Sequence, residues 1–326
     1  MKLRTFLKTL ALACSLPAAF AVQAQGYPSK PVTVIVPFGA GGGVDATARL
    51  VMQKLAEVLR TPVVIENVAG ASGTIGTLRA ARAPADGYTL LFAVASPLNV
   101  APLVQPAAVK YDTFKDFAPL ATVAVGPFVL VGRKDLAPAS AAELLKLARS
   151  QPGKLTIGTD GVGTSLHVTS ELIQQRGGMR LLHVPYKSGP QVLTDVAGGM
   201  VDLAVLPLTL AQPFIRDGKV RAYGVTSKAR WPGLPDVPAL AETADLKEVD
   251  VESWLGLLGP AGLPAPVKDT LVQAVQATMK DPEIVRKLGE IANRPMVLGP
   301  AAFAGYLARE RKLVQDVGGR AGIKAE

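Results

Sequence analysis

A strand, a glycine-rich loop and an amphipathic helix follow one another in the same order at two places in the chain. This repeat limits the possible folds more than any other feature. The first copy is 31–36, 38–43 and 44–59, and the second copy is 154–158, 159–163 and 164–175. Both copies continue with a strand, a helix and a strand, so each half has the order βαβαβ. Because strands that alternate with helices form parallel sheets covered on both faces, the sequence predicts an α/β protein with two similar lobes.

Two apolar segments that contain glycine fit neither copy of the repeat, and we expect them to be strands that cross between the lobes. They are Phe117 to Val131 and Val251 to Gly259. With these two crossings, lobe 1 is predicted to comprise residues 25–123 and 249–326, and lobe 2 is predicted to comprise residues 124–248.

The length of the chain agrees with two lobes, because 326 residues exceed what one ordinary hydrophobic core organises. After Leu263 the chain carries several helix starts marked by proline, such as Asp281-Pro282. We expect this helical tail to fold back on lobe 1.

The first 24 residues predict a signal peptide that is removed on export. Positive residues precede an apolar run from Leu10 to Val22, and small residues at Val22 and Ala24 favour cleavage after Ala24. Cys14 offers a lipoprotein site as an alternative, but the apolar stretch before it is very short. The sequence therefore predicts an exported protein of a bacterial periplasm.

The charge of the mature chain argues against nucleic acid as a partner. The full chain has a formal net charge of +9, and removal of Lys2, Arg4 and Lys8 with the signal peptide leaves +6. The remaining cations are scattered, and aromatic residues make up 5% of the chain. Nucleic-acid binders instead cluster lysine and arginine on one element.

The two glycine loops form the best candidate ligand site. In open parallel sheets, ligands bind beyond the carboxyl ends of the strands, where loops lead into helix N-termini. Amides at a helix start favour an anion, and glycine allows the anion to approach the backbone. A carboxylate clamped between 38–43 and 159–163 fits this arrangement, although each loop alone could be a tight turn that needs glycine. Dinucleotide and phosphate sites fit less well, because Val44 replaces the third glycine of GxGxxG and no GK[ST] occurs.

Four further residues are candidates near this cleft. Ser96 and Pro207 follow matched strands of the two lobes and are expected to border it. His167 could donate a hydrogen bond to the ligand or simply pack near a helix start. Asp45 could contact the ligand or stabilise the first turn of its helix.

The residues available for catalysis or metal binding are few. The only cysteine, Cys14, leaves with the signal peptide, and His167 and His183 are the only histidines. The nucleophile motifs GxSxG and S-x-x-K are absent. The sequence therefore predicts no metal, no cofactor and no catalysis; a periplasmic hydrolase or isomerase that acts on an acid, with His167 as its base, is the alternative.

Several motifs resemble those of the Bug family, the TctC-type periplasmic solute receptors of tripartite tricarboxylate transporters. The resemblance runs from about Tyr27 to the C-terminus. It rests on Tyr27-Pro-Ser-Lys-Pro-Val, Val36-Pro-Phe-Gly-Ala-Gly-Gly-Gly-Val-Asp45-Ala-Thr-Ala-Arg49, Glu66-Asn-Val-Ala-Gly-Ala-Ser-Gly-Thr, Ala85-Asp-Gly-Tyr-Thr-Leu90, Gly163-Thr-Ser-Leu-His167, His183-Val-Pro-Tyr-Lys187 and Gly198-Gly-Met-Val-Asp202.

The resemblance implies a type II periplasmic binding protein that closes like a flytrap on a small carboxylate and passes it to the membrane subunits of a transporter. Each lobe would be a doubly wound, mostly parallel sheet, and we expect a monomer. The residues that the resemblance places at the anion are Phe38, Gly39, Ala40, Gly41, Gly42, Gly163, Thr164 and Ser165, with His167 nearby. After Asp202 the chain departs from the family pattern, since Leu-Ala-Val-Leu-Pro207 replaces an aromatic and an acidic residue and makes this end of the pocket more apolar.

Overall fold

The computed structural model describes residues 26–321. The predicted signal peptide, its cleavage site after Ala24 and the alternative lipidation site at Cys14 lie outside the described residues. Within 26–321, no helix combines the length and the hydropathy that a membrane crossing requires.

The strands form one hydrogen-bonded series that runs through both halves of the molecule. Their order is β2-β1-β3-β9-β4-β7-β5-β6, and β10 and β8 also pair with β4. The strands are β1 (Val32–Val36), β2 (Val63–Asn67), β3 (Thr89–Ala93), β4 (Phe117–Arg133), β5 (Thr156–Thr159), β6 (Leu182–Pro185), β7 (Leu203–Pro207), β8 (Val220–Val225), β9 (Glu252–Pro260) and β10 (Arg294–Pro295).

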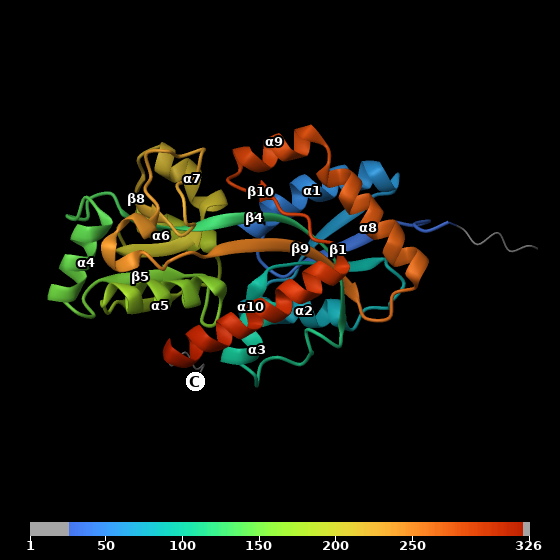
Figure 1. Ribbon diagram of the computed structural model, residues 1–326, viewed down its shortest axis with the longest axis horizontal. Helices are drawn as coiled ribbons and strands as arrows, with labels where there is room; N and C mark the ends of the chain where they lie inside the picture. The colour runs from blue at the N-terminus through green and yellow to red at the C-terminus, as the bar shows by residue number, and fades with distance from the viewer. Residues whose placement is uncertain (1–25, 322–326) are drawn as a thin grey trace, which may run out of the picture.

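Each half contains three parallel strands, and two long strands connect the halves. Strands β2, β1 and β3 are parallel, as are β6, β5 and β7. Strand β4 runs antiparallel to β9 over its first part and antiparallel to β7 and β8 over its last part. Figure 1 shows β4 and β9 extending from one group of helices to the other. The expected two-lobe α/β fold with two crossover strands is therefore confirmed.

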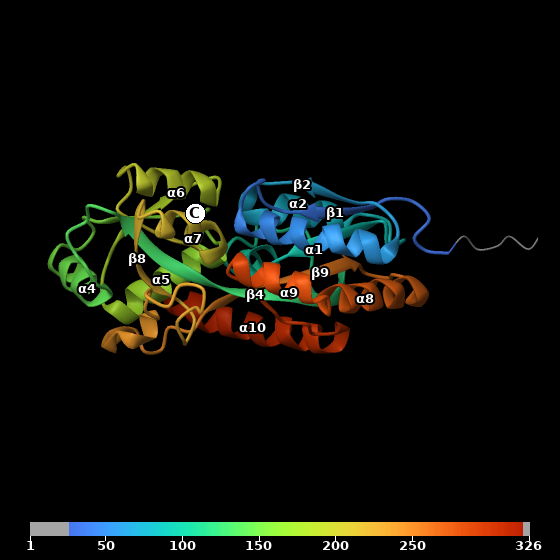
Figure 2. The same cartoon turned by 90° about the horizontal axis from the view of Figure 1, so that it is seen from above.

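Helices cover both faces of the sheet in each half (Figures 1 and 2). The larger helices are α1 (Gly43–Leu59), α2 (Thr74–Ala81), α4 (Ala141–Ser150), α5 (Ser165–Gly177), α6 (Gly189–Ala197), α7 (Leu208–Arg216), α8 (Ala265–Met279), α9 (Pro282–Glu290) and α10 (Pro300–Ala321). Shorter turns are η1 (Ala71–Gly73), η2 (Ser96–Val100), α3 (Ala101–Val104), η3 (Leu240–Glu242) and η4 (Ala244–Leu246).

The alternation of side chains along the strands explains how two cores form in each half. In β1, Val34 faces the core beneath α1, α8 and α9, whereas the neighbouring Ile35 faces the core beneath α2 and α10. In β7, Val205 packs toward α4 and α5, whereas Leu206 packs toward α6 and α7. Burial on both faces requires the continuous apolar runs that the sequence shows.

Two features differ from the sequence-based expectations. The helix α7 and the strand β8 were not predicted, since Pro213 inside α7 is a residue that normally interrupts a helix. The tail was expected to fold back on lobe 1. Its helix α8 packs on α1, but α10 contacts β4 and η2 and also α5 of the second half.

Candidate functional site

A cavity of about 600 Å³ lies between the two halves, at the place where the glycine loops meet. Its wall combines segments from both halves. They are the first glycine loop with the start of α1, the segment 69–73, the start of η2, the second glycine loop with the start of α5, the segment 186–190 and the end of β7.

The structure brings half of the predicted site residues to the wall of this cavity. The predicted residues that line it are Phe38, Gly39, Gly42, Ser96, Ser165 and Pro207. The predicted residues outside its lining are Ala40, Gly41, Asp45, Gly163, Thr164 and His167. Five of this second group take part in hydrogen bonds that join the end of a glycine loop to the first turn of the helix that follows it.

Asp45 holds the first glycine loop in shape. Its side chain is 4% exposed; Oδ2 accepts hydrogen bonds from the Gly41 amide and from Arg49 Nε, both at 2.9 Å, and Oδ1 accepts one from Asn67 Nδ2 at 2.9 Å. Burial alone would raise the pKa of Asp45, but the hydrogen bonds from Arg49, Gly41 and Asn67 outweigh it and hold the pKa below its usual value. These contacts all indicate that Asp45 is an ionised structural group.

The start of α1 leaves backbone amides available to a ligand. Gly42 is the N-cap residue and has no side chain to accept a hydrogen bond from the first turn. Gly42, Gly43 and Val44 all line the cavity. Unpaired amides and the positive end of the helix dipole make such a start suitable for an anion.

The second glycine loop is not equivalent to the first. The Gly163 amide donates to Nδ1 of His167 at 3.1 Å, and the His167 amide donates to the Thr164 hydroxyl at 3.2 Å. The Ser165 amide donates to Oγ of Ser96 at 2.9 Å. These three amides already have partners in the protein, so the two loops do not offer the same amides to a ligand.

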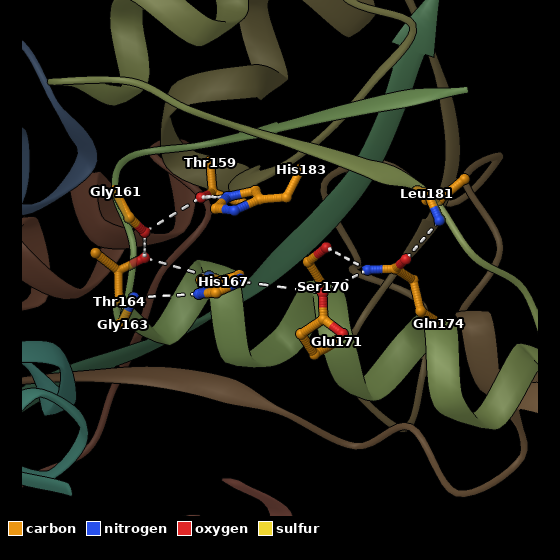
Figure 3. A network of polar contacts seen from close by, with 10 residues as sticks. All are labelled: Thr159, Gly161, Gly163, Thr164, His167, Ser170, Glu171, Gln174, Leu181 and His183. Atoms are coloured by element: carbon orange, nitrogen blue, oxygen red, sulfur yellow. Dashed lines mark hydrogen bonds and ion pairs between the residues drawn. The ribbon is translucent and has the colours of Figure 1, made fainter. Parts of the chain in front are cut away.

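His167 stacks on His183 behind the second loop (Figure 3). The ring centroids are 4.1 Å apart with an interplanar angle of 7°, and Nε2 of His183 shares a hydrogen bond of 2.7 Å with the Thr159 hydroxyl. Because Nδ1 of His167 accepts the Gly163 amide, its proton lies on Nε2, which is 3.9 Å from Oε1 of Glu171. Of the two interpretations of His167, this geometry matches packing near the helix start.

Burial and the neighbouring His183 lower the pKa of His167 to about 4. An unfolded histidine titrates near 6.5, so the folded state is stabilised by neutral His167 above that pH and loses this stabilisation as the pH falls toward 4. Between pH 7 and pH 5 we expect a loss of about 1–2 kcal/mol from this group.

The variant His167→Asn tests this expectation, because the amide oxygen of asparagine can accept the Gly163 amide without titrating. Urea unfolding at pH 7 and pH 5 should show a smaller loss of stability in the variant than in the natural protein. Equal losses in the two proteins would contradict the assigned neutral histidine.

Hydrogen bonds across the cavity hold the two halves together. Ser72 Oγ donates to the Val162 carbonyl at 2.7 Å, Gln105 Nε2 donates to the same carbonyl, and the hydroxyls of Ser96 and Ser165 are 3.0 Å apart. Ser72 and Gln105 were not among the predicted site residues. Ser72 belongs to a motif noted in the sequence, and the signal that could have found it is its position after β2, at the same sheet edge as the first glycine loop.

Comparison with known proteins identifies the family. Residues 47–314 match the family described as "Tripartite tricarboxylate transporter family receptor" (TctC). The chain belongs to the TctC family. It is also 36% identical over 314 residues to a UPF0065 protein in the tcbD-tcbE intergenic region of Pseudomonas sp. strain P51, with 96% of this chain and 93% of the relative covered.

Solved structures of TctC-type proteins share the whole fold. The periplasmic binding protein BugD is 32% identical with a TM-score of 0.86, covering 92% of this chain and all of the other. The R. palustris protein Rpa4515, solved with adipate, is 32% identical with a TM-score of 0.88, covering 91% and 99%. The resemblance to the Bug family is confirmed, and because the family consists of periplasmic receptors, this TctC protein is a receptor and the hydrolase or isomerase alternative is not supported.

Proposed function

We propose that this TctC-family receptor binds a small carboxylate in the cavity between its lobes, with one carboxylate group at the start of α1. The observation that carries the proposal is the uncapped N-terminus of α1, whose Gly42, Gly43 and Val44 line a cavity of about 600 Å³. The related protein Rpa4515 was solved with adipate, which supports a carboxylate as the ligand class.

The proposal assigns two kinds of role to the candidate residues. Those that line the cavity are proposed to contact the ligand: Phe38, Gly39, Gly42, Ser96, Ser165 and Pro207. Those behind it are proposed to hold the loops in shape: Ala40, Gly41, Asp45, Gly163, Thr164 and His167. This assignment keeps the two glycine loops as the centre of the site and gives the first loop the larger part in anion binding.

We further propose lobe boundaries at 25–123 with 249–326 for lobe 1 and 124–248 for lobe 2. Strand β4, which spans 117–133, and strand β9, which starts at Glu252, would then be the two connections. Removal of residues 1–24 in the periplasm, a monomeric receptor and delivery of the ligand to the membrane subunits of a tripartite transporter complete the proposal.

A ligand screen tests the proposed function. Thermal unfolding would be followed with mono-, di- and tricarboxylates of two to eight carbons, and isothermal titration would measure the affinity of those that raise the melting temperature. We expect at least one acid to bind with about micromolar affinity, because several charge-assisted hydrogen bonds exceed the costs of binding. If no acid binds to refolded, ligand-free protein, the proposed function is wrong.

A further inference from the structure

Three aspartates, one at a helix start and two next to a strand, have sharply different surroundings. Asp45 has the complete set of partners described above. Asp202 is equally well satisfied: Oδ1 accepts from Arg133 Nε at 2.9 Å, and Oδ2 accepts from both the amide and the hydroxyl of Thr156 at 2.9 Å. The third, Asp160, lacks such partners.

Asp160 follows β5 directly and lines the cavity. Its Oδ1 is buried and has no hydrogen-bond partner among the described residues. Among residues 26–321, no lysine, arginine or histidine lies within 4.0 Å of it as an ion-pair partner. A buried carboxylate oxygen without a donor costs free energy unless something supplies one.

The surroundings of Asp160 also affect its pKa. Burial raises the pKa of Asp160 to about 6, and the nearby Thr164 hydroxyl and the backbone amide of Asp160 itself offset only part of this effect. In the structure that hydroxyl donates instead to the Gly161 carbonyl at 3.1 Å. At neutral pH the carboxylate is ionised, and its Oδ1 has no hydrogen-bond partner among the described residues.

The charges of the cavity restrict what can supply the donor. Asp160 and Lys187 are the only charged side chains among the residues that line it. A dicarboxylate would bring two further negative charges into a wall whose own charges sum to zero. An aminocarboxylate is neutral overall and would place its positive group beside Asp160, the only acidic side chain among the residues that line the cavity.

The following inference rests on the proposed function. We propose that Asp160 determines specificity by accepting a hydrogen bond from the ammonium group of the ligand. The ligand class is then an aminocarboxylate, with its carboxylate at the start of α1 and its ammonium group at the second glycine loop. The apolar part of the wall at Pro207 and Leu210 would contact the carbon chain between the two groups.

Acids of matched length test the proposal by titration calorimetry. The pairs are 4-aminobutanoate with succinate and 6-aminohexanoate with adipate, so that only the group at one end changes. We expect the better-fitting amino acid to bind about 10- to 100-fold more tightly than its matched diacid, the range of one charge-assisted hydrogen bond.

Asp160→Asn should lower the affinity for the amino acid by about tenfold or more and leave or improve that for the diacid, because asparagine has the same shape without the charge. Asp217→Asn is the matched control, since Asp217 is an exposed aspartate of lobe 2 that pairs with Lys219 outside the cavity.

The outcomes separate this inference from the proposed function. If diacids bind as tightly as the amino acids, or if Asp160→Asn leaves their ranking unchanged, Asp160 does not determine specificity, although the protein still binds carboxylates. If none of these acids nor any in the wider screen binds, the proposed function itself is overturned and the inference falls with it.

Discussion

Gly43→Leu is expected to weaken carboxylate binding by about 100-fold or more while both lobes stay folded. A Cβ atom at Gly43 would lie 3.1 Å from Cβ of Pro207 and 3.4 Å from Cβ of Thr209, which both belong to the opposite lobe. A leucine extends further and would act as a wedge between α1 and the start of α7. Because the position has ordinary helical geometry, leucine does not strain the backbone of α1.

The size of this effect follows from lobe closure. Contacts from both lobes favour the closed form, and an affinity falls in proportion to the fraction of molecules that can close. Titration calorimetry with an acid from the screen would measure the affinity, and solution scattering would measure the radius of gyration, which should stay large at saturating ligand. Gly289→Leu is the control, because Gly289 lies in α9 and a Cβ atom there would have nothing within 4 Å. An unchanged affinity in Gly43→Leu would show that the lobes need not meet here.

Gly163→Val is expected to abolish measurable binding. Gly163 has a φ of +72°, which a β-branched residue rarely adopts. Its Cβ would lie 2.8 Å from Gln105 Nε2 and 3.2 Å from Val104 Cγ1, so the hydrogen bond from Gln105 to the Val162 carbonyl across the cavity would be lost with the loop shape. Backbone strain of about 1–3 kcal/mol adds to this loss.

Gly41→Val provides the comparison for this second variant. Gly41 has a similar φ of +79°, but nothing lies within 4 Å of its Cβ position, and it does not line the cavity. We therefore expect a smaller loss, of about tenfold, from backbone strain alone. Circular dichroism would confirm that both variants fold. Equal losses in the two variants would mean that the contact with Gln105 is unimportant.

The sequence predicts most of the fold because its strongest signal is local. The repeated strand, glycine loop and helix depend on neighbouring residues, so β1, α1, β5 and α5 were found within a few residues. The apolar crossing strands were found because they fit neither copy. Helix α7 was missed because its stability comes from packing in the core beneath α6 and α7, which outweighs the local effect of Pro213.

The site was harder to predict, because it depends on contacts between distant parts of the chain. The loop positions were found from their place at the carboxyl edge of the sheet, and this brought Phe38, Gly42 and Ser165 to the cavity wall. Which backbone amides already donate within the protein was not predictable. The Ser165 amide, for example, donates to Oγ of Ser96, which lies 69 residues away in the sequence. Asp160 lies in the predicted second loop, 159–163, but was not singled out, because an aspartate after a strand is an ordinary turn residue until its surroundings are known.

The crossing strands also determine when each lobe can finish folding. Leu91 of β3 pairs with Leu258 of β9, and Phe117 of β4 pairs with Pro260, so the sheet of lobe 1 stays incomplete until late segments of the chain are present. Pairings of such large sequence separation slow folding, because the entropy of loop closure must be overcome before the contacts form. A receptor of this topology therefore completes the sheet of its first half later than a chain of two consecutive domains would.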